Sequence, residues 1–199
     1  MRNSKVRNRW ASGRAALRSL LGCFAVLVCT QVTQSRPPQD IPAASAVASP
    51  KTYVSIAPVP RGSTFEVAVV VGIMPGFHMN AHKPLEDYLI PTVLTAKLPA
   101  GFKDLATSYP EGVTKKLSFS DKPLLVYTGQ FTVRAKFSAA ANAPLGKVKL
   151  PFTLQYQACN DSVCLPPVRI PVVAAIDVAP AGTKPQRTSP QVFGESGPK

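Results

Sequence analysis

Residues 126–137 read VYTGQFTVRAKF, a stretch whose second half alternates apolar and polar side chains. The apolar residues at every second position are Phe131, Val133, Ala135 and Phe137. Side chains two residues apart share one face of a β-strand, whereas a helix would repeat its apolar face every three or four residues. The pattern therefore predicts a strand with one face buried in a protein core.

Similar strand signals continue along most of the chain. Runs rich in β-branched and other apolar residues, separated by turn residues, occupy residues 52–57, 65–71, 92–98, 148–157 and 169–178. No segment carries a sustained helical period with caps at its ends. Short strands separated by turn signals predict an all-β fold, an immunoglobulin-like antiparallel β-sandwich.

The basic charge of the chain is concentrated at its start. The 199 residues carry a formal net charge of +13, of which residues 1–35 contribute +6 without a single acid. Elsewhere no basic run is longer than Lys115-Lys116, so the clustered patch expected of a nucleic-acid-binding protein is absent. No apolar run reaches 18 residues, which argues against a polytopic membrane protein.

The two ends of the chain differ in composition from the middle. Residues 1–35 join a basic start to a short apolar run, which predicts a signal peptide, with an uncleaved or lipidated N-terminal anchor as the alternative. Residues 36–50 predict a flexible linker, residues 51–179 the β-sandwich domain, and residues 180–199 a disordered tail. We therefore expect a periplasmic or secreted protein that meets a membrane only through such an anchor.

One cysteine pair, Cys159 and Cys164, remains outside the predicted signal. The turn residues Asn160, Asp161 and Ser162 lie between them, and a hairpin with a four-residue loop brings its flanking residues close enough for a disulfide. So short a loop adds only about 2 kcal/mol of stability in the chain-entropy description. The spacing alone leaves three interpretations open: a redox-active pair, a structural clip and a metal site.

His78 and His82 are the only histidines, and they bear on the third interpretation. Imidazoles and thiolates together suit copper or zinc. A polar loop that follows a strand explains the two histidines more simply, so we expect no metal and no organic cofactor. The sequence also lacks the common nucleotide-binding and hydrolase motifs.

The cysteine segment YQACNDSVCLPP, residues 156–167, resembles that of the N-terminal periplasmic domain of the thiol:disulfide interchange protein DsbD. The stretches GFHMNAHKP at 76–84 and YLIPT at 88–92 are similar to an early strand and loop of the same family. The resemblance extends over about residues 50–178. It implies an immunoglobulin-like fold and the chemistry of thiol–disulfide exchange.

The resemblance also assigns roles to particular residues. Cys159 and Cys164 would form the redox pair, with Cys159 reacting with the partner and Cys164 resolving the intermediate. The cap loop of the family, which shields the pair, would include Phe119 and Asp121. The side chains expected beside the disulfide are His78, Asn80 and Tyr156. Two features depart from the family pattern: only four residues separate the cysteines, where some members have five, and lysines replace the acidic residues of the cap.

The function implied by the resemblance is a relay of reducing equivalents in the periplasm. A separate membrane protein would supply electrons, and thioredoxin-like proteins would receive them, with the chain serving as one component of a protein-disulfide reductase system. Two other hypotheses stay open at this stage. The chain could be an immunoglobulin-like binding module with a structural disulfide, or a protein that handles copper or zinc.

Overall fold

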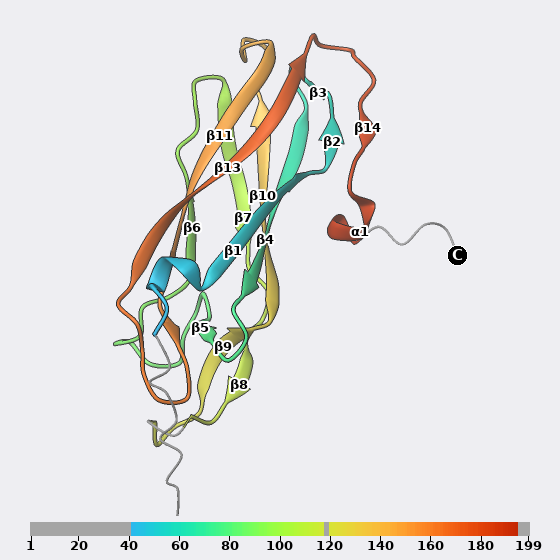
Figure 1. Ribbon diagram of the computed structural model, residues 1–199. Helices are drawn as coiled ribbons and strands as arrows, with labels where there is room; N and C mark the ends of the chain where they lie inside the picture. Colours follow the sequence, from blue (N-terminus) through green and yellow to red (C-terminus); the bar gives the residue numbers. More distant parts are fainter. Residues whose placement is uncertain (1–40, 118–119, 195–199) are drawn as a thin grey trace, which may run out of the picture. The chain divides into compact units, whose positions relative to one another are not determined.

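The computed structural model describes residues 41–117 and 120–194. Two four-stranded sheets pack face to face (Figure 1). The first sheet has the order β1-β4-β10-β7 and consists of β1 (Ala48–Val54), β4 (Thr64–Ile73), β10 (Gln130–Ala139) and β7 (Phe102–Ser108). The second has the order β3-β13-β11-β6 and consists of β3 (Val59–Pro60), β13 (Val168–Ala179), β11 (Gly146–Tyr156) and β6 (Val93–Ala96). Among the strands of the described residues only β3 pairs in parallel, so the all-β, immunoglobulin-like antiparallel sandwich is confirmed.

Alternating side chains of both sheets build the core between them. The four apolar residues predicted to share one face of β10 are all buried. The ring of Phe137 lies 5.8 Å from that of Phe65 on the same sheet and 5.8 Å from that of Phe152 on the opposite sheet. Because aromatic rings bury large apolar areas, this trio of phenylalanines joins the two layers at the centre of the sandwich.

The predicted strand at residues 126–137 is in fact two strands. β9 (Leu124–Thr128) ends before Gly129, and β10 begins after it in a different sheet. Gly129 has a φ of +63°, a left-handed conformation that residues with a Cβ adopt reluctantly. A single glycine inside a strand-like run is a weak boundary signal, which is why the break was not predicted.

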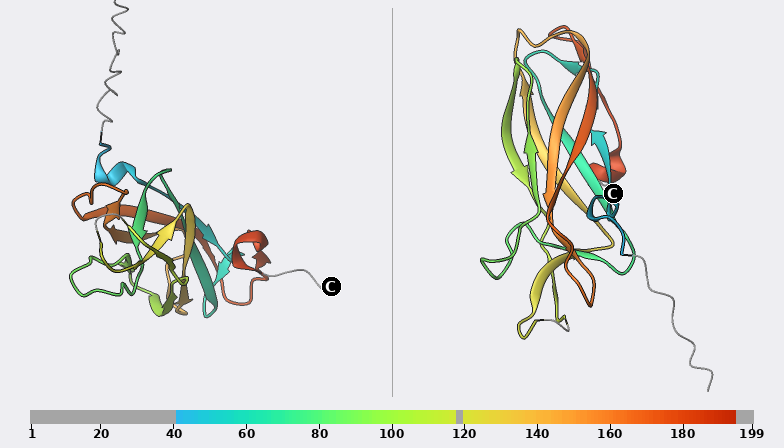
Figure 2. Two further views of the ribbon diagram at one scale, coloured as in Figure 1. Left: turned by 90° about the horizontal axis from the view of Figure 1, so that it is seen from below. Right: turned by 60° about the vertical axis from the view of Figure 1, so that its left-hand side comes forward.

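A third, smaller sheet lies at one end of the sandwich (Figures 1 and 2). Its order is β12-β5-β9-β8, with β12 (Ala158–Cys159), β5 (His78–Asn80), β9 and β8 (Val113–Lys115). β12 directly follows β11, and β10 directly follows β9, so the small sheet is continuous in sequence with both large sheets. This end of the molecule contains the cysteine pair.

The boundaries of the domain differ from the prediction. A short 3₁₀ helix, η1 (Ala44–Ala46), and the start of β1 lie within the expected linker of residues 36–50. Ala44 accepts a hydrogen bond of 2.7 Å from the hydroxyl of Tyr156. This part of the expected linker is therefore held against the domain, by contacts that its Pro- and Ala-rich composition does not indicate. The predicted signal at residues 1–35 lies outside the described residues.

The expected disordered tail also contains structure up to residue 194. β14 (Gln186–Arg187) pairs with β2 (Ile56–Ala57), and α1 (Pro190–Phe193) follows it. The Arg134 guanidinium donates a 2.6 Å hydrogen bond to the carbonyl of Val192. Backbone pairing with an edge strand orders this segment without an apolar face, and composition alone does not reveal such pairing.

Among the described residues, no helix has the length and apolar character needed to cross a lipid bilayer.

Replacing Phe137 with alanine tests the central packing. We expect Phe137→Ala to lower the free energy of unfolding by about 3–5 kcal/mol, because it removes a buried ring and leaves a cavity. Lys136→Ala, at the neighbouring exposed position of β10, should change it by less than about 0.5 kcal/mol. Urea unfolding measures both, and equal effects of the two substitutions would contradict the assignment of faces.

Candidate functional site

The two faces of the small sheet have different roles. Met79 of β5, Tyr127 of β9 and Ala158 of β12 are buried in the main core of the sandwich. Alternate residues of the same strands, His78 and Cys159, must therefore project from the opposite face. The sheet thus separates the main core from the cysteine pair.

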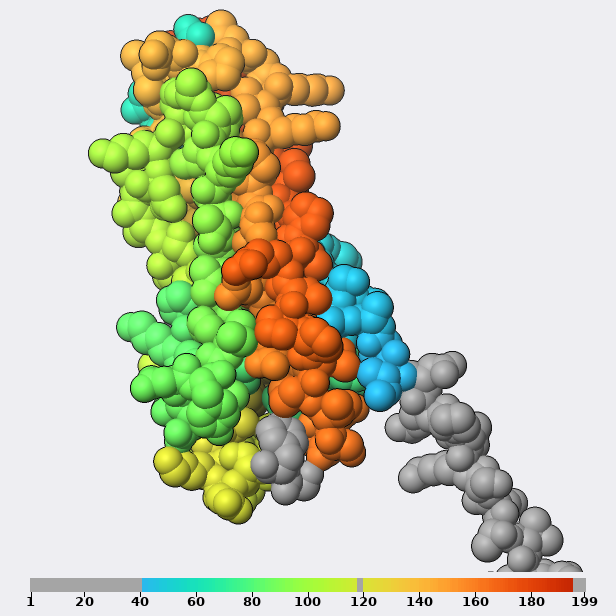
Figure 3. Space-filling view, turned by 90° about the vertical axis from the view of Figure 1, so that its left-hand side faces the viewer, coloured from blue at the N-terminus to red at the C-terminus, as the bar shows by residue number. Residues whose placement is uncertain are grey.

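The face that carries Cys159 has its own apolar cover. Leu124 and Val126 of β9 project from it and form a second buried cluster with Leu89 and Leu117. These two leucines come from the loop of residues 81–92 and from the segment that follows β8. Both segments lie beside the cysteine hairpin at the lower end of the face shown in Figure 3. The surroundings of the pair are therefore assembled from segments far apart in the sequence.

Cys159 and Cys164 form a disulfide with an S–S distance of 2.04 Å and a Cα–Cα distance of 4.0 Å. They face each other across an antiparallel bridge. Backbone hydrogen bonds flank the bridge on both sides, from Asn160 to Val163 at 2.9 Å and from Leu165 to Ala158 at 2.8 Å. The cysteines therefore occupy a non-hydrogen-bonded pair position, where opposing side chains approach most closely.

The turn between the cysteines is held by its first residue. The side-chain carbonyl of Asn160 accepts hydrogen bonds from the backbone N–H groups of Ser162 at 2.9 Å and Val163 at 2.8 Å. An asparagine that bonds to the backbone two residues later forms an Asx turn, so a turn does occupy the place where the sequence predicted one. The hairpin is thus held closed by the turn as well as by the disulfide.

The two sulfur-bearing residues differ in exposure. Cys159 is only 1% exposed, whereas Cys164 is exposed to solvent. The strand pairing explains the difference, because Cys159 lies inside the sheet next to β5 while Cys164 pairs only with Cys159. A large reagent therefore reaches the pair from the side of Cys164.

His78 lies directly opposite Cys159 in the pairing of β5 with β12. Opposed residues of antiparallel strands have Cβ atoms about 4.5–5.5 Å apart and project to the same side. The His78 side chain is fully buried, and neither ring nitrogen has a hydrogen-bond partner among the described residues. Burial, together with the nearby Lys115 cation, lowers the pKa of His78 from 6.5 to about 4, while Asp161 opposes this change. The imidazole beside the disulfide is consequently neutral at neutral pH.

Asn80 connects the same face to the neighbouring loop. Its side-chain amide donates to the carbonyl of Ile90 at 3.0 Å and to the side-chain oxygen of Gln157 at 3.4 Å. Gln157 in turn donates to the backbone carbonyl of Leu165 at 3.3 Å. Asn80 and Gln157 thus link β5 to both arms of the cysteine hairpin. Gln157 was not among the predicted site residues, although it is two residues from Cys159 and so falls on the same face of an extended chain.

Tyr156, in contrast, is directed away from the disulfide. It is buried in the main core, and its hydroxyl donates to Ala44. The structure therefore brings His78 and Asn80 to the face of the cysteine pair but does not bring Tyr156 there.

The predicted cap is described only in part. Phe119 lies outside the described residues, and Asp121 is exposed and accepts a hydrogen bond from Lys116 through its backbone carbonyl. Lys115 forms an ion pair of 3.3 Å with Asp161 in the cysteine turn. The segment around residue 117 is therefore tied to the hairpin by a lysine, at a position where the family resemblance led us to expect acidic residues.

The alternative of a metal site has little support in the observed geometry. His82 does not approach the cysteines, because its ring stacks on Tyr109 at 3.6 Å and its Nδ1 atom lies 3.0 Å from the carbonyl oxygen of Thr92. Within the described ranges, no three His, Cys, Asp or Glu side chains gather closely enough to hold a metal ion.

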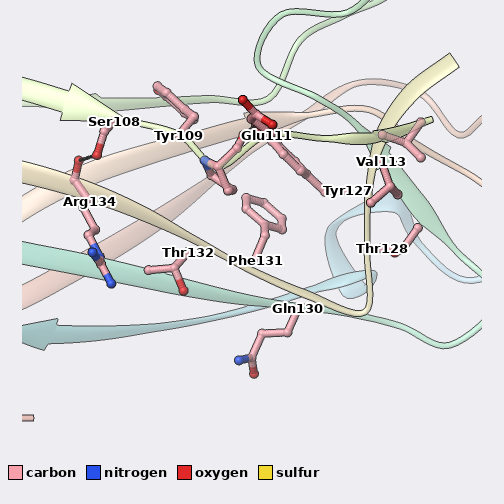
Figure 4. Close-up of a pocket in the computed structure, with 12 residues that line it drawn as sticks. Ser108, Tyr109, Glu111, Val113, Tyr127, Thr128, Gln130, Phe131, Thr132 and Arg134 are labelled. Carbon is pink, nitrogen blue, oxygen red and sulfur yellow. Dashed lines mark hydrogen bonds between the residues drawn. The ribbon is translucent and has the colours of Figure 1, made fainter. Parts of the chain in front are cut away.

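A separate cavity of about 500 Å³ lies beside β9 and β10 (Figure 4). Tyr109, Tyr127, Phe131 and Arg134 are among its lining residues, and the rings of Tyr127 and Phe131 stack at 4.3 Å. Neither cysteine lines this cavity. The candidate site is therefore the cysteine hairpin with its neighbours on β5, and not the hollow beside β10.

Residues 44–172 match the protein family described as "Thiol:disulfide interchange protein DsbD, N-terminal". The chain belongs to this family. It is accordingly a thiol–disulfide interchange domain with a cysteine pair, as the resemblance of the cysteine segment indicated.

Two solved structures match parts of the chain. The DsbD N-terminal domain of Neisseria meningitidis in its reduced form has 18% sequence identity and a TM-score of 0.44, and the match covers 75% of this chain and 97% of that one. The N-terminal periplasmic domain of ScsB from Proteus mirabilis has 10% identity and a TM-score of 0.45, with 72% of this chain and 49% of that one covered. A search of curated protein sequences found no match.

The buried imidazole predicts an acid-dependent loss of stability. Unfolded His78 binds a proton below pH 6.5, whereas folded His78 binds one only near pH 4, so the stability present above pH 6.5 is lost as the pH falls toward 4. The difference corresponds to about 3 kcal/mol. Urea unfolding of the disulfide form should therefore show a smaller acid-induced loss for His78→Gln than for the wild type. Identical pH dependence of the two proteins would contradict the assignment.

Proposed function

We propose that the domain exchanges its disulfide with thioredoxin-like proteins in the periplasm, and that Cys164 is the cysteine that reacts with them. The observation that carries this proposal is the difference in exposure between the buried Cys159 and the exposed Cys164. It reverses the roles expected from the sequence, where Cys159 was assigned the reaction with the partner. Membership in the family supports thiol–disulfide interchange as the chemistry.

Reduction of the pair follows from this geometry. A partner thiolate attacks Cys164 Sγ in line with the Cys159–Cys164 bond, and that bond breaks with its electron pair left on Cys159 Sγ. The partner's second thiolate then attacks the partner sulfur of the mixed disulfide, and Cys164 leaves as a thiolate. Two protons complete the two thiols, so the pair gains two electrons and the partner dithiol becomes a disulfide. The same steps in reverse pass the electrons to an oxidised client.

The position of the disulfide supports exchange over a structural clip. A covalent loop of this length adds only about 2 kcal/mol. The Asx turn and the two flanking backbone hydrogen bonds already hold the hairpin. A sandwich with a continuous aromatic and aliphatic core gains little from a link at one end. We therefore favour the interchange function over that of an immunoglobulin-like module with an inert clip.

The predicted export signal and the family both support a periplasmic location. An oxidising compartment keeps the pair as a disulfide until a reductant reaches it. We propose that a separate membrane protein provides that reductant and that the reduced domain serves thioredoxin-like clients. No metal or organic cofactor takes part in these steps.

Two single-cysteine variants test which sulfur reacts. Both are made in a chain whose Cys23 and Cys29 are serine, where Cys159→Ala keeps only the exposed cysteine and Cys164→Ala only the buried one, so each isolates one thiol. The probe is a purified thioredoxin whose resolving cysteine is alanine and whose remaining cysteine carries thionitrobenzoate. We expect Cys159→Ala to form the mixed disulfide at least about ten-fold faster, because a buried thiol is shielded from the partner and is less ionised. Release of thionitrobenzoate gives the rate, and mass spectrometry identifies the adduct.

The outcomes separate the hypotheses. Faster reaction of Cys164→Ala would overturn the assignment of Cys164 and restore the roles expected from the sequence. Failure of both variants to react with the thioredoxin, with both folded by circular dichroism, would favour the structural clip.

A further inference from the structure

His78 is a buried titratable group for which the exchange steps above have no use. It lies at the first position of β5, between β12 and β9, and projects to the side of the cysteines. Thr128 is its opposite neighbour on β9 and does not titrate. The charged and titratable groups that act on it are Lys115 of β8, Asp161 of the turn, and the cysteine pair itself. A polar ring in this place requires an explanation, because buried polar groups are nearly always hydrogen-bonded.

The oxidation state of the pair provides that explanation. In the disulfide form, Cys159 carries no proton, and neither nitrogen of His78 has a partner among the described residues. Reduction converts Cys159 into a thiol, which can donate a hydrogen bond to the ring at the directly opposed position. The imidazole is neutral above pH about 4, so one ring nitrogen carries a lone pair that can accept this proton.

We propose that His78 is the proton acceptor for Cys159 when the reduced pair closes to a disulfide. This inference rests on the proposed interchange function. The exposed Cys164 thiolate first attacks a client disulfide, and one client sulfur leaves as a thiolate. The S–H bond of Cys159 then breaks, its proton moves to the ring nitrogen of His78, and its electron pair forms the bond to Cys164 Sγ. The second client sulfur leaves with the electrons of the mixed disulfide, and the proton on His78 passes to a departing thiolate or to water.

The two cysteines differ in their need for such a group. Cys164 is exposed, so water and buffer can remove its proton. Cys159 is 1% exposed, and burial in apolar surroundings raises the pKa of a thiol. Without an internal acceptor, closure would wait for rare ionisation of a buried thiol. His78 should therefore affect the closure step and leave the first attack by Cys164 unchanged.

Oxidation of the reduced full-length chain by glutathione disulfide separates the two steps when Cys23 and Cys29 are serine in every protein compared, the wild-type reference included. Acid quenching followed by mass spectrometry distinguishes the reduced protein, the Cys164–glutathione adduct and the closed disulfide. We expect His78→Gln to slow closure at neutral pH by about a hundred-fold, the lower end for general-base catalysis. The rate of adduct formation should stay within about two-fold of the wild type, because Cys164 reacts in solvent contact. His78→Phe, which keeps a ring but has no proton acceptor, should behave like His78→Gln and serves if one variant fails to fold.

Met79→Leu is the matched control. Met79 is the next residue of β5 and is equally buried, but it faces the main core. The substitution conserves volume, so it perturbs the strand without removing a proton acceptor. Closure in Met79→Leu should stay within about two-fold of the wild type.

The pH profile provides the readout that a purely structural role would not change. Closure in His78→Gln should rise about ten-fold per pH unit up to the pKa of the Cys159 thiol, whereas the wild-type rate should depend less steeply on pH. The role of His78 would be overturned if His78→Gln slowed closure by less than about ten-fold. It would also be overturned if the closure rate of His78→Gln were lower than that of the wild type by the same factor at every pH. If the wild-type protein itself forms no adduct with glutathione disulfide, the proposed interchange function fails instead. The two failures are therefore distinguishable.

Discussion

The register in which β5 pairs with β12 determines what surrounds the disulfide. His78 opposes Cys159, and Met79 opposes Ala158. A slip of one residue would exchange the two faces, sending the imidazole into the main core and Met79 against the sulfur. Such a slip is prevented by the core itself, which receives Met79, Tyr127 and Ala158 from the same sheet. The environment of the cysteines is thus set by apolar packing on the side of the sheet that faces away from them.

The same arrangement explains why a single hairpin has one protected and one accessible sulfur. β12 is only two residues long, and it joins the small sheet through β5 before the chain turns at Asn160. The returning arm pairs with Cys159 alone, so Cys164 gains no further neighbour from the sheet. Asn80 and Gln157 hold both arms in place through side-chain hydrogen bonds. The difference in solvent exposure between the two cysteines therefore follows from strand pairing, and no particular residue in the turn is needed to produce it.

Parts of the fold with strong two-residue periodicity could be predicted from the sequence. β4, β10, β11 and β13 are long strands with one apolar face, and their alternation is legible without tertiary information. β7 was missed because residues 102–108 are exposed or half-exposed and lack an apolar face. β5 and β12 show no period of their own, because strands of three and two residues are too short, and only the cysteine hairpin and the family resemblance indicated them. These short strands are held by pairing with strands that are distant in the sequence. The same is true of the segment around β14.

The cysteine pair and the two β5 residues beside it could likewise be inferred, whereas the orientation of Tyr156 was misjudged. Proximity in the chain suggested that Tyr156 lies near the disulfide, yet period-two alternation in YQAC groups it with Ala158 and groups Gln157 with Cys159. The structure follows the alternation. The relative exposure of the two cysteines could not be predicted from the sequence, because it depends on which arm of the hairpin pairs with the small sheet.

The charges near His78 clarify why its neutral state is robust. Lys115 lowers the pKa of His78 and Asp161 raises it, and these two groups form an ion pair with each other at 3.3 Å. Their opposed effects partly cancel, so burial is the dominant cause of the lowered pKa. The Lys115–Asp161 ion pair is exposed, so salt would screen the effect of both charges on His78. Salt does not change the free-energy cost of burying a protonated His78 ring. The imidazole of His78 therefore stays neutral at low and high ionic strength. The neighbour that can change its protonation is Cys159, whose sulfur gains a proton when the disulfide is reduced.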